Sequence, residues 1–282
     1  MKRGTLFVLS TPIGHLGDFS FRGLEVLRQV AVVAAEDTRR TRRLLAHYEV
    51  QKEIVSLHAH SGPEALERLL DRVEAGEDVA YATDAGTPGI SDPGAALAAR
   101  AHERGLTVVP VPGPAAVIAA LAAAGFTADR FVFAGFLPRK GASRAALLAR
   151  LAAEPWTVVC YEAPNRTVAL LRDLAASCGA GRPAAVAREL TKLHEEVRRG
   201  TVGELGRYYE EHPPRGEVTV VVGGAPAGSA GAAAVDRAPT EGEVSGLVAE
   251  LRAGGGSPGA NAKELAQRLG ISRHDAYRLL SR

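Results

Sequence analysis

Residues 79–94 read Val79-Ala-Tyr-Ala-Thr-Asp84-Ala-Gly86-Thr87-Pro88-Gly89-Ile-Ser91-Asp92-Pro93-Gly94, and this stretch decides the fold. A short apolar run ends at a carboxylate, and a loop rich in glycine and proline then opens into an alanine-rich helical pattern. Open α/β sheets use this order of strand, tight loop and helix to place backbone donors and one acid at the carboxyl edge, where ligands bind. Proline restricts φ, and glycine tolerates positions without room for a Cβ atom. We therefore predict a ligand-binding loop, the alternative being a purely structural turn.

The bulk composition predicts a globular, cytoplasmic protein of two domains. The chain has 282 residues, of which 46% are hydrophobic and 23% are charged, which argues against disorder. The net charge is +2, so any contact with nucleic acid must come from a local basic patch. Cys160 and Cys178 fall in regular elements and indicate buried, reduced thiols of a cytosolic protein. No run reaches the length of a signal sequence or a membrane span, so we expect no membrane partner.

The first half of the chain alternates apolar runs with helical patterns, which predicts an N-terminal α/β domain over residues 1–124. Strands that are apolar throughout and are separated by helices indicate a parallel sheet covered on both faces. The expected strands are 6–9, 31–35, 54–57, 79–82 and 106–109, and the expected helices are 21–29, 38–48, 64–74, 95–103 and 115–124.

The pattern restarts after Gly125, which predicts a second α/β domain over residues 125–224. Residues 225–239 have the composition of a flexible linker. Residues 240–282 are predicted to form a small helical module that resembles a helix-turn-helix, with Gly270 at the turn and Ser272 as an N-cap. A helical hairpin that simply packs on the body is an equal alternative. In the second domain we expect strands at 131–134, 157–161, 184–188 and 217–222, and helices at 143–151, 167–178 and 202–211.

Acidic side chains follow the apolar runs in both domains. They are Glu36, Asp37, Asp84, Glu162 and Glu189. If the strands are parallel, these acids share one edge of the structure, which favours a site there. A single acid at a strand end can equally be a helix N-cap, above all Asp37 before the helix at 38–48.

Two further loops are expected at that edge, over residues 10–18 and 110–116. Both open helices and can offer backbone N–H groups and a positive helix end. Neither matches a dinucleotide fingerprint or a phosphate-binding loop, which disfavours an unrelated nucleotide-binding protein. The closest histidine pair, His58 and His60, has no cysteine or carboxylate at ligand spacing, so no metal site is expected.

Basic residues form two local groups rather than a global field. Arg39, Arg40, Arg42 and Arg43 lie just past the Glu36-Asp37 pair, and Arg139, Lys140 and Arg144 follow an aromatic run. Such groups are often solvated helix faces, but beside an acid-lined edge they can hold the phosphates of a polyanion.

A series of short motifs runs along nearly the whole chain. They are Thr11-Pro-Ile-Gly14, Ala35-Glu-Asp-Thr-Arg39, Asp84-Ala-Gly-Thr-Pro88, Ile90-Ser-Asp-Pro-Gly94, Pro112-Gly-Pro114, Gly135-Phe-Leu-Pro138, Tyr161-Glu-Ala-Pro-Asn-Arg166, Arg188-Glu-Leu-Thr-Lys192 and Arg215-Gly-Glu217. Through these motifs the chain resembles the ribosomal RNA 2′-O-ribose cytidine methyltransferase family of the tetrapyrrole methylase superfamily. The chain departs from the family's usual pattern at Ser10, His15 and Asn165, and none of these changes removes an acid.

The resemblance implies two α/β domains of tetrapyrrole-methylase type, with S-adenosylmethionine in the cleft between them. It also implies a homodimer and, as substrate, a cytidine in the decoding region of 16S rRNA within the small ribosomal subunit. Carried over by motif, the residues expected to bind the cofactor are Pro12, Asp84, Ala85, Gly86, Thr87, Gly113, Ala115, Ala116, Tyr161, Leu190 and Val218.

For the reaction itself, a positioned base should help a weakly nucleophilic ribose hydroxyl by ~10²–10⁴-fold. We expect Asp37 or Glu36 to be that base, with Arg39 orienting the sugar-phosphate. Two other functions stay open at this point. The same cleft would serve a tetrapyrrole C-methyltransferase, and a relative without activity could still bind RNA.

Overall fold

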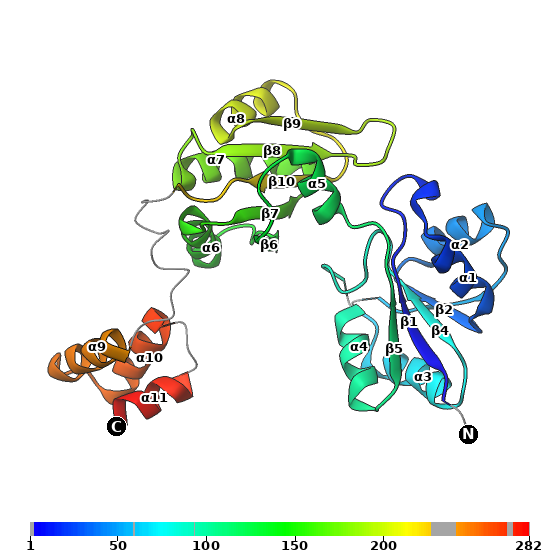
Figure 1. Ribbon diagram of the computed structural model, residues 1–282, viewed down its shortest axis with the longest axis horizontal. Helices are drawn as coiled ribbons and strands as arrows, with labels where there is room; N and C mark the ends of the chain where they lie inside the picture. Colours follow the sequence, from blue (N-terminus) through cyan, green and yellow to red (C-terminus); the bar gives the residue numbers. More distant parts are fainter. Residues whose placement is uncertain (1–2, 59, 93, 227–240, 270–272, 282) are drawn as a thin grey trace. The chain divides into compact units, whose positions relative to one another are not determined.

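The computed structural model describes residues 3–58, 60–92, 94–226, 241–269 and 273–281. The chain divides into two compact units, Met1–Pro226 and Ala227–Arg282. Each unit has its own hydrophobic core. The larger unit contains two separate five-stranded sheets, and Figure 1 labels their strands and helices.

The first sheet is parallel throughout and has the strand order β3-β2-β4-β1-β5. The central strands β2 and β4 are buried along their whole length, which explains why their sequences are continuously apolar. The parallel registers, such as Leu6 beside Val79, bring the carboxyl ends of all five strands to one edge. The strands span Thr5–Leu9 (β1), Val32–Ala35 (β2), Glu53–Ser56 (β3), Val79–Ala82 (β4) and Thr107–Val111 (β5).

Four helices cover both faces of this sheet (Figure 1). Helices α1 (Phe21–Gln29) and α2 (Thr38–His47) pack on one face, and α3 (Pro63–Glu74) and α4 (Gly94–Glu103) pack on the other. A short 3₁₀ helix, η1 (Leu16–Asp18), precedes α1. The helix starts follow local sequence rules, because Ser20 caps α1 and proline opens α3.

The second sheet is mixed and has the order β6-β7-β10-β8-β9. Strand β10 runs antiparallel to both of its neighbours, so β7 and β8 share one direction. The carboxyl ends of β7 and β8 therefore lie at the same edge as the start of β10. The strands span Phe131–Phe136 (β6), Thr157–Glu162 (β7), Pro183–Arg188 (β8), Glu196–Thr201 (β9) and Val218–Val222 (β10).

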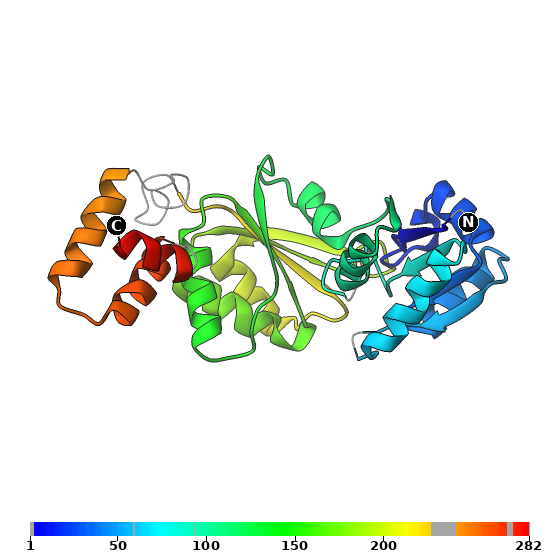
Figure 2. The ribbon, with the colours of Figure 1, turned by 90° about the horizontal axis from the view of Figure 1, so that it is seen from below.

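Helices also cover both faces of the second sheet (Figures 1 and 2). Helices α6 (Ala142–Ala153), α7 (Thr167–Cys178) and α8 (Val202–Glu211) pack on one face, and the 3₁₀ helix η2 (Pro164–Arg166) precedes α7. Helix α5 (Ala116–Ala124) packs on the other face, although it directly follows the last strand of the first sheet. Packing thus places α5 with the second sheet, whereas its sequence position groups it with residues 1–124.

The C-terminal unit contains three described helices, α9 (Glu241–Ala253), α10 (Pro258–Leu269) and α11 (Arg273–Ser281). Their small core includes Leu251, Leu265 and Ala276. The predicted turn residue Gly270 and cap Ser272 lie outside the described residues, as does the predicted linker from residue 227 onward. Over the described residues, no helix combines the length and the apolar character that a membrane crossing requires.

The expected fold class is confirmed: two α/β sheets are followed by a helical tail. The expected strands and helices of the larger unit are present, with ends that differ by a few residues at most. One strand was not predicted, β9, whose residues Glu196–Thr201 include two arginines and a glutamate. This strand lies at the edge of the sheet and does not need the apolar character of a central strand.

Candidate active site

A cavity of about 470 Å³ lies among the strand-end loops of both sheets. Its volume is in the range of small-molecule sites. The first domain contributes the ends of β2 and β4, and the second contributes the ends of β6 and β7 and the start of β10. Its lining residues are Ile13, Glu36, Arg40, Thr83–Thr87, Ile90–Asp92, Ala115, Ala116, Phe136, Tyr161–Pro164 and Gly216–Thr219.

The loop after β4 is fixed to the loop after β1 by backbone hydrogen bonds. The N–H of Thr11 donates to the carbonyl of Gly86 at 2.9 Å, and the N–H of Gly86 donates back to Thr11 at 3.0 Å. Gly86 has a φ of +89°, a conformation that glycine adopts without strain. The Thr87 hydroxyl donates to the Pro114 carbonyl at 3.1 Å, which ties this loop to the start of α5. The loop is therefore a rigid wall of the cavity.

Gly113 supports this wall from behind rather than lining the cavity. A Cβ atom at residue 113 would lie 2.8 Å from the Cβ atom of Ser10, closer than packed carbon atoms tolerate. The glycine lets the loop after β5 approach the loop after β1. Helix α5 then begins with no side chain capping its N-terminus, and Ala115 and Ala116 at that end line the cavity. Unsatisfied N–H groups at a helix start favour an anionic ligand group.

Three carboxylates of the first domain line this cavity: Glu36, Asp84 and Asp92. Partial burial, followed by the charges of Asp84 and Asp92, raises the pKa of Glu36 above its ordinary value. The Thr83 hydroxyl lies 3.4 Å from Glu36 Oε2 and opposes that rise as a weak donor. Within the described part of the chain, no salt bridge reaches Glu36, whereas Arg40 Nε lies 3.8 Å from Asp84 Oδ2. Glu36 is thus a carboxylate that binds protons more readily than an exposed glutamate does.

Asp37 has a structural task at the start of α2. Its Oδ1 accepts the N–H of Arg39 at 2.9 Å, and the Arg39 guanidinium binds both carboxylate oxygens. The hydrogen bonds from Arg39 lower the pKa of Asp37 to about 2. The backbone N–H of Asp37 donates to Asp84 Oδ1 at 2.7 Å and so positions that acid. Neither Asp37 nor Arg39 is among the residues that line the cavity, and Asp37 is the N-cap of α2.

The wall from the second domain is built around a buried ion pair. The Glu162 side chain is fully buried, accepts the N–H of Ala163 at 2.9 Å and lies 3.0 Å from Arg166 Nη2. Arg166 also donates to the carbonyl of Leu137 at 2.8 Å, which fixes the loop after β6. Beside the pair, the Tyr161 ring contacts Phe136 with ring centroids 5.5 Å apart. The ends of β6 and β7 thus form one supported surface.

The start of β10 is held by a lysine between two glutamates. Lys192 Nζ lies 2.8 Å from Glu189 Oε1 and 3.0 Å from Glu217 Oε2. Gly216 has a φ of +78°, and a Cβ there would lie 2.0 Å from Glu189 Oε1. Any larger residue at 216 would therefore displace the Glu189 carboxylate. Glu189 does not line the cavity itself but positions Glu217, which does.

A second cavity of about 400 Å³ adjoins the first and shares Arg40, Asp84 and Ala85 with it. It is more basic, because Arg40, Arg43 and Lys192 line it together with the predicted residue Pro12. The first-domain loop at Gly14 closely approaches the second-domain loop at 190–192, since a Cβ on Gly14 would lie 2.5 Å from Lys192 Cγ. The two cavities are therefore neighbours, and acidic side chains predominate in the first and basic side chains in the second.

The structure brings most of the predicted site residues together. Leu190 and Gly113 lie behind the cavity walls, because Leu190 packs against the apolar cluster beneath α5 and Gly113 packs against Ser10. The predicted residues that line the first cavity are Glu36, Asp84, Ala85, Gly86, Thr87, Ala115, Ala116, Tyr161 and Val218. Unpredicted lining residues include Ile90, Phe136 and Gly216, each of which belongs to a motif quoted above, so motif membership was the available signal.

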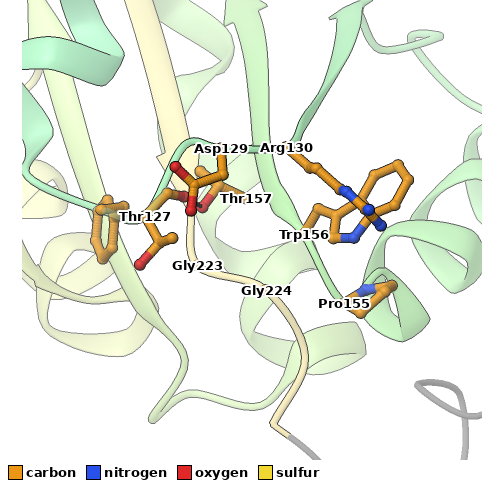
Figure 3. Close-up of a pocket in the computed structure, with 9 residues that line it drawn as sticks. Thr127, Asp129, Arg130, Pro155, Trp156, Thr157, Gly223 and Gly224 are labelled. Carbon is orange, nitrogen blue, oxygen red and sulfur yellow. Dashed lines mark hydrogen bonds between the residues drawn. The ribbon is translucent and has the colours of Figure 1, made fainter. Parts of the chain in front are cut away.

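A third cavity of about 450 Å³ lies at the opposite edge of the second sheet, beside the starts of β6 and β7 (Figure 3). Arg130 lies over the Trp156 ring there, 5.4 Å from its centroid. Ligands of open α/β sheets bind outside the carboxyl ends of strands, which favours the first cavity. Among the described residues, no group of three histidine, cysteine or carboxylate side chains has metal-binding geometry.

Comparison with known proteins identifies the relatives of this chain. The family model for Tetrapyrrole (Corrin/Porphyrin) Methylases matches residues 5–206. The Ribosomal RNA small subunit methyltransferase I of Synechocystis sp. is 41% identical over 277 residues, which cover 98% of this chain and 97% of the relative. The protein of that name from Xylella fastidiosa (strain Temecula1) is 47% identical over 224 residues, covering 79% and 82%.

Solved structures share the fold at low sequence identity. A diphthine synthase aligns with a TM-score of 0.61 at 16% identity, covering 78% of this chain and 90% of that one. A uroporphyrin-III C-methyltransferase from Thermus thermophilus complexed with S-adenosylhomocysteine aligns with a TM-score of 0.58 at 16% identity, covering 78% and 97%. At these identities the likeness shows the fold alone.

Proposed function

The chain belongs to the ribosomal RNA small subunit methyltransferase I family of tetrapyrrole methylases, and we propose on this basis that it methylates 16S rRNA from S-adenosylmethionine. The acceptor is the ribose 2′-OH of a cytidine in the decoding region. The observation that carries the proposal is the adjoining pair of cavities. One holds the partly buried acid Glu36, and the other holds Arg40, Arg43 and Lys192. A methyl donor and an RNA backbone require these two environments side by side.

The first cavity fits S-adenosylmethionine in size and in chemistry. Its apolar walls at Tyr161 and Val218 suit the adenosine part, and the uncapped start of α5 at Ala115 suits the amino-acid carboxylate. The carboxylates Asp84 and Asp92 favour a bound cation. When bound, the cofactor supplies a methyl group on a positively charged sulfur, which departs as a neutral thioether.

Glu36 is the group in the cavity that is suited to accept a proton. Its raised pKa makes it a stronger base than an ordinary glutamate. One carboxylate oxygen of Glu36 accepts the proton of the ribose 2′-OH while the 2′-oxygen receives the methyl group. Asp37 acts indirectly, because its backbone N–H orients Asp84 and its side chain begins helix α2.

The basic cavity and helix α2 hold the RNA backbone. Arg40, Arg43 and Lys192 line that cavity, and the exposed Arg39 and Arg42 extend the charge along α2. Guanidinium groups bind phosphate oxygens through paired hydrogen bonds. Each phosphate neutralised should steepen the dependence of log affinity on log salt by about 0.7–0.9.

The natural substrate is the assembled small subunit, which presents the target nucleotide in a defined shape. The enzyme acts in the cytoplasm as a homodimer. Both proposals rest on family membership. In the larger unit, the exposed side chains of Ile90 and Phe136 line the cavity where it opens to solvent.

The test uses purified protein, methyl-labelled S-adenosylmethionine and 30S subunits from a strain that lacks the enzyme. We expect label in 16S rRNA, and nuclease digestion with mass spectrometry should yield 2′-O-methylcytidine. Label on a base, or on a tetrapyrrole instead of rRNA, would contradict the proposal. Calorimetric titration of S-adenosylmethionine serves as the control, because absent binding would instead indicate an RNA-binding relative without activity.

A further inference from the structure

Two exposed apolar side chains face the same cavity from different domains. Ile90 is 42% exposed and lies in the loop after β4, and Phe136 is 56% exposed and ends β6. Both line the first cavity. The two loops approach each other, since a Cβ built on Gly135 would lie 4.0 Å from Ser91 Oγ. Exposed apolar surface beside a polar site usually marks a place that a partner or ligand covers.

The structure holds Phe136 in its exposed position. Gly135 before it has a φ of +62°, which turns the chain where a larger residue would be strained. Leu137 after it is buried, and its carbonyl accepts a hydrogen bond from the guanidinium of Arg166. The next carbonyl, of Pro138, accepts the buried Arg144 at 2.8 Å. Two arginines thus fix the backbone on one side of an exposed aromatic ring.

Arg144 is itself anchored by a salt bridge, with Nη2 2.7 Å from Asp173 Oδ2 on α7. On its inner side the Phe136 ring contacts Tyr161, so one edge is supported while more than half of its surface faces solvent. A ring held in this way loses little conformational entropy when a flat ligand stacks on it.

Hydrogen bonds also fix the backbone around Ile90. The Asp92 carboxylate accepts the N–H groups of Gly89 and Gly94 at 2.7–2.9 Å and closes the turn around Ile90. Ser91 has a φ of +68°, an unusual conformation for a residue with a side chain. Rigid backbone therefore supports both apolar side chains at the rim of the cavity.

We propose that Phe136 and Ile90 form a slot that receives the nucleobase of the nucleotide being methylated, with the base stacked on the Phe136 ring. This inference rests on the proposed function and names the substrate contact that it requires. Enzymes that modify RNA recognise unstacked bases by stacking them on aromatic side chains. The exposed Arg139 and Lys140 follow on the same loop and can bind the adjoining phosphate. Glu36 lines the same cavity and meets the ribose attached to that base.

Stacking on Phe136 is a contact with substrate, so its loss should appear in the KM for 30S subunits. Base–aromatic stacking lost on substitution by alanine corresponds to a roughly 5- to 150-fold weaker interaction. Phe136→Ala should raise that KM within this range and leave the dissociation constant of S-adenosylhomocysteine within about twofold. Phe136→Tyr retains a ring and should restore the KM. Phe21→Ala is the matched control, because Phe21 is 91% exposed and does not line the cavity.

The experiment measures initial rates on 30S subunits, filter binding of 30S subunits with S-adenosylhomocysteine present, and calorimetric binding of S-adenosylhomocysteine alone. Equal loss of S-adenosylhomocysteine binding in Phe136→Ala would overturn the proposal and assign the slot to the methyl donor. An unchanged KM together with unchanged 30S binding would also overturn it. If wild-type protein does not methylate 30S subunits, the proposed function fails separately, and the filter-binding arm still decides whether Phe136 contacts RNA.

Discussion

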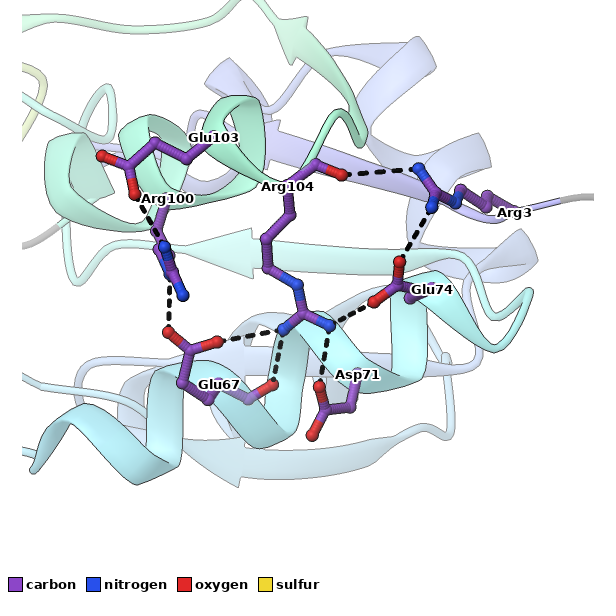
Figure 4. Close-up of polar contacts among 7 residues, drawn as sticks. All are labelled: Arg3, Glu67, Asp71, Glu74, Arg100, Glu103 and Arg104. Carbon is purple, nitrogen blue, oxygen red and sulfur yellow. Dashed lines mark hydrogen bonds and ion pairs between the residues drawn. The ribbon is translucent and has the colours of Figure 1, made fainter.

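Two groups of carboxylates in the first domain differ in their electrostatic surroundings. In the cavity, partial burial of Glu36, followed by the like charges of Asp84 and Asp92, raises its pKa. Between helices α3 and α4, by contrast, the acids are paired with arginines (Figure 4). The pKa of Glu74 there is lowered, chiefly by its hydrogen bond from Arg104. Glutamate therefore serves as a candidate base in one region and as an ion-pair partner of arginine in the other.

The difference follows from what surrounds each acid. Arg104 alone binds carboxylates of Glu67, Asp71 and Glu74, and Arg3 adds a second contact to Glu74 at 2.9 Å. Such a network places a guanidinium beside each carboxylate and contributes modestly to stability. Keeping several acids together with few cations costs stability, and proteins concentrate such costs at functional sites.

The largest expected effect comes from Glu36→Gln, which removes the proposed base but keeps the shape of the side chain. We expect methyl transfer to 30S subunits to fall by ~10²–10⁴-fold, with S-adenosylmethionine binding largely retained. Wild-type kcat should decline on acidification with a midpoint above the ordinary glutamate pKa, because the folded protein raises the Glu36 pKa and protonation removes the base. The variant should lack this decline.

Asp37→Asn is the matched control, since it changes the neighbouring acid by the same chemistry. Asparagine is also a good N-cap, so helix α2 should persist and turnover should stay within a few-fold of wild type. If Asp37→Asn abolished turnover while Glu36→Gln did not, the two roles would have to be exchanged.

A large loss of stability is expected for Arg166→Met, which leaves the buried Glu162 carboxylate without its cation. Breaking a buried ion pair costs about 3 kcal/mol or more, because a charge then remains in an apolar environment. Arg166→Met also frees the Leu137 carbonyl, so the loop carrying Phe136 should loosen. Urea unfolding gives the stability change directly.

Arg172→Met supplies the comparison, because Arg172 lies on helix α7 and its pair with Glu210 is exposed. We expect Arg172→Met to change the unfolding free energy by less than about 1 kcal/mol. Equal losses in Arg166→Met and Arg172→Met would mean that burial of Glu162 does not set the cost.

The smallest effect is expected for Arg104→Met in the paired region. The carboxylates that it pairs with are exposed to solvent, so the loss of stability should be no more than about 1 kcal/mol and should shrink in molar salt. Methyl transfer should stay at the wild-type rate. A stability loss independent of salt would show that Arg104 contributes through packing instead of charge.

The sequence predicted the fold well where apolar periodicity carries the information, and less well elsewhere. Strands β2 and β4 are buried on both faces and read as continuous apolar runs. Strand β9 was missed because an edge strand with Arg198 and Arg199 has no such run. Helix α5 is apolar nearly all round, so its sequence could not indicate which sheet it packs on. Apolar periodicity likewise could not indicate which strands of the second sheet run antiparallel.

For the site, the sequence motifs located the walls of the cavity but did not indicate the roles of individual side chains. Glu36 and Asp37 are adjacent acids after one strand, and successive residues there point in different directions. Their separation into a cavity acid and an N-cap depends on the start of α2 and on Arg39. Phe136 was within a quoted motif, yet its exposed position depends on backbone contacts from Arg144 and Arg166, which lie outside that motif.

The most direct test of the contrast is a carboxyl ¹³C NMR titration of the whole protein, with Glu36→Gln and Glu74→Gln used for assignment. The structure predicts that Glu36 titrates above the ordinary glutamate value and Glu74 below it. It also predicts that Asp84→Asn lowers the Glu36 pKa, since a like charge is removed. A Glu36 pKa at or below that of Glu74 would contradict the assignment of Glu36 as the base.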